Sequence, residues 1–519
     1  MPLCIVQLTF LLLTTSLVEL RPSCYNKHHC SGDRSQYDTL ALLLLLCSEP
    51  SLCHKKKQMN QKTSNCLQIK PINYHSDLSL ELFNKVASLP WAMLLRSASR
   101  EHVDSRFDIL VAAPLVKIIT SGQTTLVVHP EGQFESDQDP FQLLEQQQDQ
   151  WLPKLDYQGK LPFIGGALGY FSYDLGRRVE QLPQIAQQDL ATPDMAVGIY
   201  SWAVVLDHQN KTAFVVGENV DEHYGWLISQ APRLDQDFVL TSEWQSNMTK
   251  QEYVKRFSRV KDYLHSGDCY QINLAQRFNA EYTGCEWQAY QTLERFNQGP
   301  FSAFIRIDKS AILSVSPERF IQLSDRKIET KPIKGTRPRY ACIQADSAQA
   351  NELAIAEKDQ AENLMIVDLL RNDIGKVAKP GTVHVPKLFD IESFPAVHHL
   401  VSTIRAELRD DYSTADLLRA CFPGGSITGA PKIRAMEIIE ELEPHRRNAY
   451  CGSIGYISRH GRMDTSITIR TLVAESNKIY VWAGGGLVAD SKSCSEYQET
   501  LDKLCRILPI LNTVLSSKD

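Results

Sequence analysis

Two hydrophobic patterns alternate along this chain. Between about residues 76 and 245, short runs rich in β-branched residues lie between turn residues, at 107–114, 124–130, 198–208 and 211–218. Runs of this kind are typical of β-strands. From residue 249 onwards, other stretches carry an apolar side chain at every third or fourth position, as amphipathic helices do. The pattern predicts a chain of mixed α and β structure.

Several helical stretches have recognisable ends. Residues 249–268 begin at Thr249, a suitable N-cap, and stop at Gly267. Residues 360–373 carry a single apolar stripe, and Pro431 suits the first turn of a further helix. Residues 493–511 predict the last helix. Between the helices we predict strands at 270–278 and 301–307, and a meander with turns at 458–461 and 475–477. The order of these elements does not form regular βαβ units.

Composition narrows the class of protein. The 519 residues are 43% hydrophobic and 22% charged, as in ordinary globular proteins, and this length allows two to four domains or one large two-lobed enzyme. A net charge of −6 argues against nucleic acid as the main partner, but an anionic small molecule needs only local positive charge. Six of the thirteen cysteines lie in the first 66 residues, and the other seven show no metal-ligand spacing. We interpret those seven as reduced cytosolic thiols.

The N-terminal segment has a different character. Residues 5–18 resemble the apolar part of a signal peptide, but no Lys or Arg precedes them. A second apolar run, residues 41–47, is too short to span a bilayer. We predict an atypical leader over residues 1–72, either disordered or produced by an upstream start codon, and a short tail at 513–519. Export or membrane anchoring is the alternative interpretation.

Lys334 is the first candidate for chemistry. It lies in the segment KPIKGTRPR, residues 331–339, directly before Gly335. Glycine lets the backbone approach a bound small molecule closely. A lysine amine becomes a covalent nucleophile when its pKa falls from about 10.4, although a solvated surface lysine is the alternative.

The surrounding blocks resemble the chorismate-utilising enzyme family. They occur in the family's order over about residues 76–510: SVSPERF (314–320), KPIKGTRPR, AENLMIVDLLRNDIGKV (361–377), FPAVHHLVS (394–402), FPGGSITGAPKIRAMEII (422–439), CGSIGYIS (451–458), ITIRTLV (467–473), AGGGLVADS (483–491) and SEYQET (495–500). The resemblance implies an α+β fold, a large α/β sandwich of two mostly antiparallel sheets flanked by helices. It also implies an N-terminal region at 73–245 and a chorismate-binding catalytic region at 246–512.

The branch of the family is indicated by Lys334. Anthranilate synthases usually have alanine there, whereas the PIKGT form resembles the large component of the enzymes that aminate chorismate at C4 in p-aminobenzoate and folate synthesis. The resemblance implies that Lys334 adds at C2 of chorismate and that Glu318 protonates the leaving C4 hydroxyl; ammonia then displaces the lysine. The resemblance therefore implies an amino-transferring, cytoplasmic enzyme. Taken alone, Glu318 could equally form a salt bridge.

A magnesium ion and a set of substrate contacts follow from the same resemblance. Mg²⁺ would be bound by Glu362 and Glu499, with Glu496 acting through water, although solvated helix acids are the alternative. The predicted substrate-binding residues are Gly335, Thr336, His399, Ser426, Tyr456, Arg470, Gly484, Gly485 and Gly486. We place Arg470 on a strand, alternating with Ile469 and Thr471, where its guanidinium would bind a carboxylate. Gln271 stands where isochorismate- and salicylate-forming members carry a lysine that activates water, and glutamine lacks that basicity.

A second site and a partner complete the expectations. Relatives bind tryptophan at positions that match Ser97, Asp104, Ser105, Arg106, Phe107, Pro300, Phe301 and Ser302. Asp104 replaces the usual aromatic residue, so the retention of tryptophan is open. No glutaminase signature is visible in the sequence, so a separate glutamine amidotransferase subunit should supply ammonia. The alternatives are an anthranilate synthase component I and a non-catalytic tryptophan-binding regulatory subunit.

Overall fold

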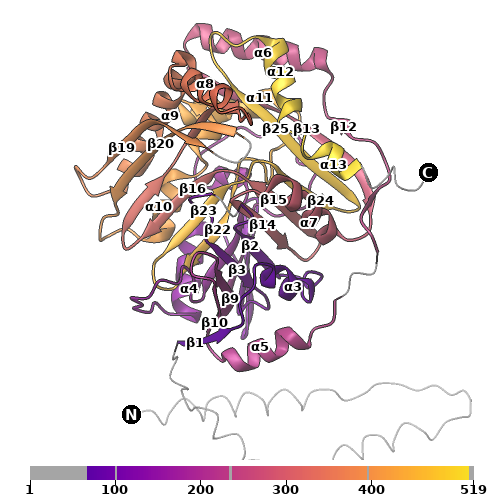
Figure 1. The fold of residues 1–519 in the computed structure, drawn as a ribbon, viewed down its shortest axis with the longest axis vertical. Helices are drawn as coiled ribbons and strands as arrows, with labels where there is room; N and C mark the ends of the chain where they lie inside the picture. The colour runs from indigo at the N-terminus through magenta and orange to yellow at the C-terminus, as the bar shows by residue number, and fades with distance from the viewer. Residues whose placement is uncertain (1–66, 100–101, 233–235, 394–396, 513–519) are drawn as a thin grey trace, which may run out of the picture. The chain divides into compact units, whose positions relative to one another are not determined.

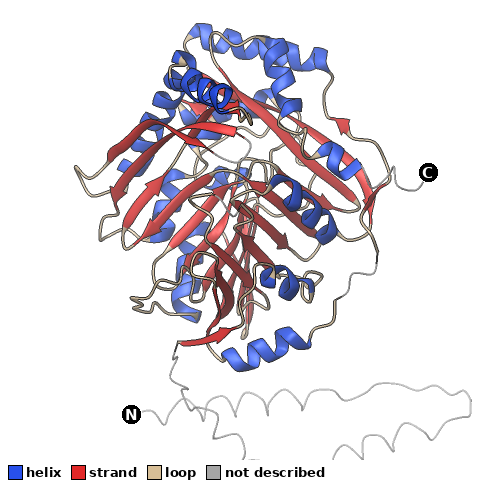
Figure 2. Ribbon diagram, in the orientation of Figure 1, coloured by secondary structure: helices blue, strands red, loops and turns tan. Residues whose placement is uncertain are grey.

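Two large β-sheets form the body of the protein. The computed structural model describes residues 67–99, 102–232, 236–393 and 397–512. Within them one sheet has 13 strands and the other 12, and every strand pair is antiparallel. Helices surround the sheets (Figures 1 and 2). The predicted α+β sandwich is confirmed.

The strands of each sheet come from distant parts of the chain. The first sheet has the order β1 (Gln68–Ile72), β10 (Thr212–Gly217), β9 (Trp202–Asp207), β3 (Phe107–Val111), β2 (Met93–Arg96), β14 (Phe301–Arg306), β15 (Ser310–Ser316), β24 (Thr471–Glu475), β25 (Lys478–Leu487), β13 (Gln271–Thr283) and β11 (Val239–Leu240), with β12 (Gln245–Ser246) and β21 (Gly429–Ala430) also paired to β13. The second has the order β18 (Ile333–Pro338), β20 (Val397–Glu407), β17 (Lys327–Thr330), β16 (Arg319–Ser324), β23 (Met463–Ile467), β22 (Ser453–Ser458), β7 (Gly166–Phe171), β8 (Met195–Tyr200), β4 (Val116–Ser121), β5 (Thr124–His129) and β6 (Gly132–Ser136), with β19 (His384–Ser393) beside β20.

The helices cover the outer faces and one end of the sheets. They are α3 (Leu78–Asn84), α4 (Pro140–Trp151), α5 (Val220–Ser229), α6 (Lys250–Ser266), α7 (Glu286–Asn297), α8 (Ile343–Ala354), α9 (Glu357–Gly375), α10 (Thr414–Cys421), α11 (Lys432–Leu442), α12 (Ser493–Asp502) and α13 (Leu508–Asn512), with 3₁₀ turns η1 (Tyr173–Arg178) and η2 (Gly425–Ile427). No helix among the residues that the structure describes is long and apolar enough to cross a membrane.

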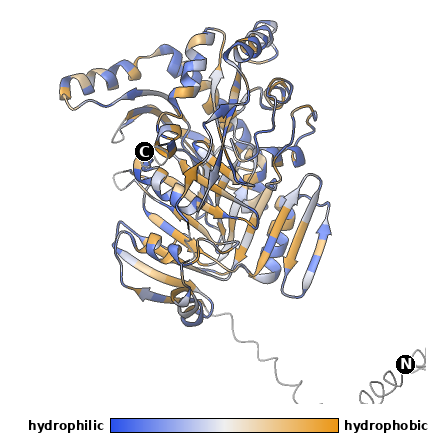
Figure 3. Cartoon of the chain, turned by 90° about the vertical axis from the view of Figure 1, so that its right-hand side faces the viewer, coloured by the Kyte–Doolittle hydropathy of each residue, from blue (hydrophilic) through white to orange (hydrophobic). Residues whose placement is uncertain are grey.

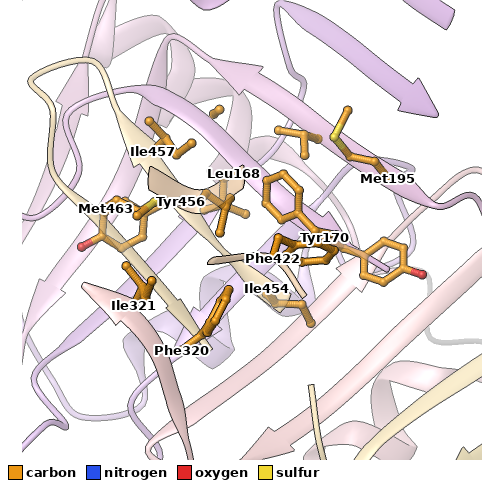
Figure 4. Close-up of a cluster of buried hydrophobic side chains, with 14 of the residues drawn as sticks. Leu168, Tyr170, Met195, Phe320, Ile321, Phe422, Ile454, Tyr456, Ile457 and Met463 are labelled. Atoms are coloured by element: carbon orange, nitrogen blue, oxygen red, sulfur yellow. The ribbon is translucent and has the colours of Figure 1, made fainter. Parts of the chain in front are cut away.

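The position of the hydrophobic core explains why many strands have apolar residues at consecutive positions. The largest cluster joins Met93 and Ile109 of the first sheet to Ile118 and Leu168 of the second. Figure 4 shows part of it, with side chains of β7, β8, β16, β22 and β23 packed around Phe422. A second cluster lies on the other face of the first sheet, under α3, α5, α7 and α13. Both faces of the sheet are therefore buried, and the hydrophobic residues gather in its strands (Figure 3).

Local signals located α6 correctly. Thr249 and Glu252 form a reciprocal capping box, and Gly267 ends the helix with a left-handed φ of 82°. Two other predictions were wrong in detail. The run 198–208 is two strands, β8 and β9, which lie in different sheets and meet at Ser201. The expected last helix is broken into α12 and α13.

The predicted boundaries need one correction. Residues 68–72, expected in the leader, form β1 and pair with β10 from Gln68–Gly217 to Ile72–Ala213. The apolar runs 5–18 and 41–47, and the tail 513–519, lie outside the described residues. Strands from both sides of residue 245 take part in each sheet, so that boundary divides the chain but not the sheets.

Candidate active site

One cavity of about 570 Å³ is lined by residues of both sheets. The first sheet contributes the start of β13 and the glycines of β25, and the second contributes β18 and His399 of β20. Helices α9 and α12 and the turn η2 supply further side chains. Of the predicted catalytic, substrate and metal residues, the cavity is lined by Glu318, Lys334, Gly335, Thr336, Glu362, His399, Ser426, Arg470, Gly484, Gly486, Glu496 and Glu499.

Lys334 is held at the point where β18 bulges away from β20. The register shifts between Lys334 and Thr336, and Gly335 in the bulge has a φ of 71°. A Cβ there would lie 2.9 Å from a side-chain carbon of Asp359, so both conformation and space favour glycine. The Lys334 side chain is only 15% exposed; its Nζ lies 3.2 Å from Glu362 Oε1 and donates to the Ser426 carbonyl at 3.0 Å. The predicted nucleophile therefore faces the cavity.

Glu318 lies where the chain passes from β15 in the first sheet to β16 in the second. It is 6% exposed and accepts a 3.3 Å hydrogen bond from Ser426 Oγ. Burial raises the pKa of its carboxyl, while the nearby Lys334 charge and the Ser426 hydroxyl oppose the rise. A carboxyl whose protonated form is favoured by burial suits a general acid.

Three carboxylates lie on the helices that close the cavity. Glu362 of α9 accepts from Gln271 Nε2 at 2.8 Å, and Glu496 and Glu499 project from α12. A Cβ on Gly485 would lie 3.3 Å from Glu496 Oε2 and 3.4 Å from Glu499 Oε1, so both carboxylates reach β25. Burial raises the pKa of Glu496, and the charge of Glu499 adds to the rise.

This donor set fits Mg²⁺, which takes one or two carboxylates and completes its shell with water and substrate oxygens. A cation between Glu496 and Glu499 would relieve their mutual repulsion. No three acidic, histidine or cysteine side chains within the described residues form a ready cluster for a metal. The side chains that would hold the ion are three of the cavity-lining carboxylates, Glu362, Glu496 and Glu499, which do not form such a cluster in this structure.

Arg470 supplies a cation without a counter-ion. It is largely buried and lines the cavity, and no carboxylate among the described residues pairs with its guanidinium. Burial lowers its pKa, and the charge of Arg506 lowers it further. His399 lies nearby and shares a 2.8 Å hydrogen bond with Thr336 Oγ1. Burial, aided by the Arg470 charge, lowers the pKa of His399 to about 4, so its imidazole is neutral near pH 7.

The structure changes three of the predicted substrate contacts. Arg470 is not on a strand: it lies in the crossover from β23 to β24, with a left-handed φ of 51°. Tyr456 packs in the core against Phe163 and does not line the cavity (Figure 4). Gly485 is not among the lining residues but backs Glu496 and Glu499.

Sequence reasoning missed several residues that do line the cavity. Asn273, Tyr450 and Lys503 are among them, and Lys503 Nζ donates to the Gly484 carbonyl at 2.8 Å. Tyr450 directly precedes the block 451–458 that contains Tyr456, and no periodicity shows which of the two tyrosines faces the cavity. Lys503 stands one helical turn after Glu499, and that spacing was a usable signal.

A second, smaller pocket of about 80 Å³ holds most of the predicted tryptophan residues. Ser97, Asp104, Phe107, Pro300, Phe301 and Ser302 line it, whereas Ser105 and Arg106 do not. Arg106 instead pairs with Asp207 at 2.7 Å. The Asp104 carboxylate is itself bound, to Arg319 at 2.7 Å and to Lys331 at 3.5 Å. Tryptophan binding stays a prediction.

Fold and cavity together define an enzyme for a small anionic substrate, with a lysine, a buried carboxyl group and an arginine without a carboxylate partner among the described residues at one surface. The sequence profile of the chorismate binding enzyme family matches residues 94–509, and the chain belongs to that family.

All seven cysteines in the described residues are free, as predicted.

The similarity to known proteins extends over nearly their whole length. The chain is 57% identical over 436 residues to aminodeoxychorismate synthase component 1 of Escherichia coli K12, covering 84% of this chain and 96% of that protein. It is 33% identical over 450 residues to anthranilate synthase component 1 of Pseudomonas putida, covering 82% and 91%. The crystal structure of anthranilate synthase component I from Streptococcus pneumoniae superimposes with a TM-score of 0.69 at 32% identity, covering 78% and 93%.

Proposed function

We propose that this chain is an aminodeoxychorismate synthase component 1, which converts chorismate and ammonia to 4-amino-4-deoxychorismate and water. The observation that carries the proposal is the amine of Lys334, which faces the cavity between Glu362 and Ser426. The relative with 57% identity bears this name. Anthranilate synthases usually have alanine at the position of Lys334, so the lysine disfavours anthranilate synthesis as the activity of this chain.

The first step is addition of Lys334 to chorismate. The amine must lose its proton, and Glu362, 3.2 Å away, is a base within reach. Nζ then forms a bond to C2, the ring double bonds shift, and the C4–O bond breaks. Glu318 gives its proton to the departing oxygen, so the hydroxyl leaves as water. The raised pKa of Glu318 keeps that proton available.

The second step replaces lysine by ammonia. Ammonia forms a bond to C4, the double bonds shift back, and the C2–Nζ bond breaks. The proton that the added ammonia loses goes to Glu318, and Lys334 recovers its own proton from Glu362, so the sum is one hydroxyl exchanged for one amine. The enolpyruvyl ether is untouched. Gln271, buried beside Glu362, has no basicity with which to activate a competing water.

Charge holds the substrate in place. Chorismate carries two carboxylates, and the unpaired guanidinium of Arg470 is positioned to bind one of them. Gly484, Gly486 and Lys503 line the same surface. Mg²⁺, when bound by Glu362, Glu496 and Glu499, would offset the negative charge of these groups and of a substrate carboxylate.

The name component 1, carried by the relatives, implies a second component. We infer that a separate glutamine amidotransferase subunit delivers the ammonia. A cytoplasmic location stays a prediction of the sequence.

Product analysis tests the proposal. The protein, given chorismate, Mg²⁺ and ammonium, should form 4-amino-4-deoxychorismate and release no pyruvate. Lys334→Ala should lose most of this activity. Anthranilate with an equal amount of pyruvate as the main product would show that the chain is an anthranilate synthase component instead.

A further inference from the structure

A buried ion pair lies directly behind the wall of the cavity. Arg447 and Glu443 have side chains only 1% and 4% exposed, and their two hydrogen bonds measure 2.9 and 2.6 Å. Neither residue lines the cavity. Ion pairs removed from water contribute little net stability, because desolvation offsets their attraction. Stability alone therefore does not account for this one.

Three further contacts of Arg447 go to segments that line the cavity; its guanidinium carbon also lies 4.9 Å from the centre of the Tyr173 ring, which does not line the cavity. Its Nη1 donates to the Ile427 carbonyl at 3.0 Å. Its Nη2 donates to the carbonyl and the side-chain oxygen of Asn273, at 3.0 and 3.2 Å. Its guanidinium carbon lies 5.5 Å from the centre of the Tyr450 ring. One planar group thus contacts three separate parts of the wall.

Each of these parts is connected to the reacting groups. Ile427 follows Ser426, whose carbonyl accepts from Lys334 and whose hydroxyl donates to Glu318. Asn273 lies opposite Gly486 in the ladder between β13 and β25. The guanidinium therefore connects the turn that contacts Lys334 and Glu318 to the strands that form the facing wall.

We propose that Arg447 is a positioning residue for amination: through Ile427, Asn273 and Tyr450 it sets the separation between the Lys334–Glu318 side of the cavity and the glycine strand. The inference rests on the proposed function. A lysine at this position keeps the charge and can reach Glu443, but a single ammonium cannot replace the planar fork of donors. Arg470, which is proposed to bind the substrate carboxylate, lies between β23 and β24, whereas Arg447 lies between α11 and β22. Carboxylate binding therefore does not depend on Arg447.

Two variants and one control test the proposal. Arg447→Lys keeps a charge opposite Glu443. The double variant Arg447→Met with Glu443→Gln removes both charges, and the new amide oxygen can still accept from the Ala275 amide as Glu443 does at 2.9 Å. Arg459→Lys is the control, because Arg459 is 2% exposed, pairs with Glu218 and does not line the cavity.

We expect a split between turnover and binding. In both Arg447 variants kcat for ammonium-dependent amination should fall about 10- to 100-fold per folded protein, as expected for misplaced reacting groups. The Kd for chorismate, measured by calorimetry with Mg²⁺ in a Lys334→Ala background where no covalent adduct forms, should change less than about threefold, because the charge that binds it is intact. Arg459→Lys should keep the parent kcat.

The opposite results are equally clear. A kcat within twofold of the parent in folded Arg447→Lys and in the double variant would overturn the proposal. So would a loss that disappears once activity is corrected for the folded fraction, since that is what a merely structural ion pair gives. If the parent itself does not aminate chorismate, the proposed function fails; that result appears in the parent alone and is distinct from an active parent whose Arg447 variants keep its kcat.

Discussion

Replacing Arg470 by glutamine should weaken substrate binding without weakening the fold. The guanidinium lines the cavity, is largely buried, and has no carboxylate partner among the described residues. In the unliganded protein it bears the cost of desolvation and the repulsion of Arg506. A substrate carboxylate would supply the missing partner. Binding and stability should therefore respond to the substitution in opposite directions.

The magnitudes follow from the contacts. A bidentate guanidinium–carboxylate pair with charge-assisted hydrogen bonds contributes about 3 kcal/mol, so Arg470→Gln should raise the Kd for chorismate about 100-fold. The free energy of unfolding should stay the same or rise by about 1 kcal/mol, because an unpaired buried charge is removed. The same substitution at Arg459, which pairs with Glu218, should instead lower it by about 3 kcal/mol.

Calorimetry and denaturant unfolding measure the two quantities. Chorismate binding is best compared in a Lys334→Ala background, where covalent chemistry does not contribute. A Kd within threefold of the parent would refute the role of Arg470 in binding. A loss of stability in Arg470→Gln as large as in Arg459→Gln would show that the guanidinium has a partner in the folded protein and that the reasoning about an unpaired charge is wrong.

Three further outcomes are expected. Burial raises the pKa of Glu318, and the carboxyl loses its proton as the pH rises through that pKa. Because the protonated form is the general acid, kcat should fall on the alkaline side. Glu318→Gln should be slow at every pH and should lack that fall. Glu499→Gln should weaken Mg²⁺ binding, measured by calorimetry with chorismate present, at least about tenfold, and an unchanged affinity would remove Glu499 from the metal site. A chain starting at Asn73 lacks β1 and leaves the edge of β10 unpaired, so its Tm should be lower than that of a chain starting at Leu67, which should match the full chain. Equal Tm values for the two shortened chains would show that β1 contributes nothing to stability.

The sequence was sufficient where the physics is local. Helix α6 was predicted with both ends because its capping box and its terminal glycine act within four residues. The break between α12 and α13 also had a local signal, Pro509 in the first turn of α13, which was overlooked. Proline cannot donate a hydrogen bond to the preceding turn, so a continuous helix over 493–511 was not available.

Other features depend on contacts between distant segments. Ser201 separates two apolar runs that enter different sheets, and every residue of β8 and β9 is buried, so alternation carries no information on where one strand ends. Arg470 reaches the cavity only because the chain crosses between sheets with a left-handed residue there. The choice between Tyr450 and Tyr456 is of the same kind. Family resemblance supplied most of the site, and only the fold could show which side chains meet.

Trapping the covalent intermediate tests the central claim most directly. The protein is incubated with chorismate and Mg²⁺ but without ammonia, quenched and digested, and the mass of the peptide containing Lys334 is measured. We predict a chorismate-derived adduct on Lys334 that disappears when ammonium is added before the quench, and slower adduct formation in Glu318→Gln. An unmodified Lys334, in a protein that aminates chorismate and under conditions shown to preserve such adducts, would contradict the account and leave direct attack by ammonia.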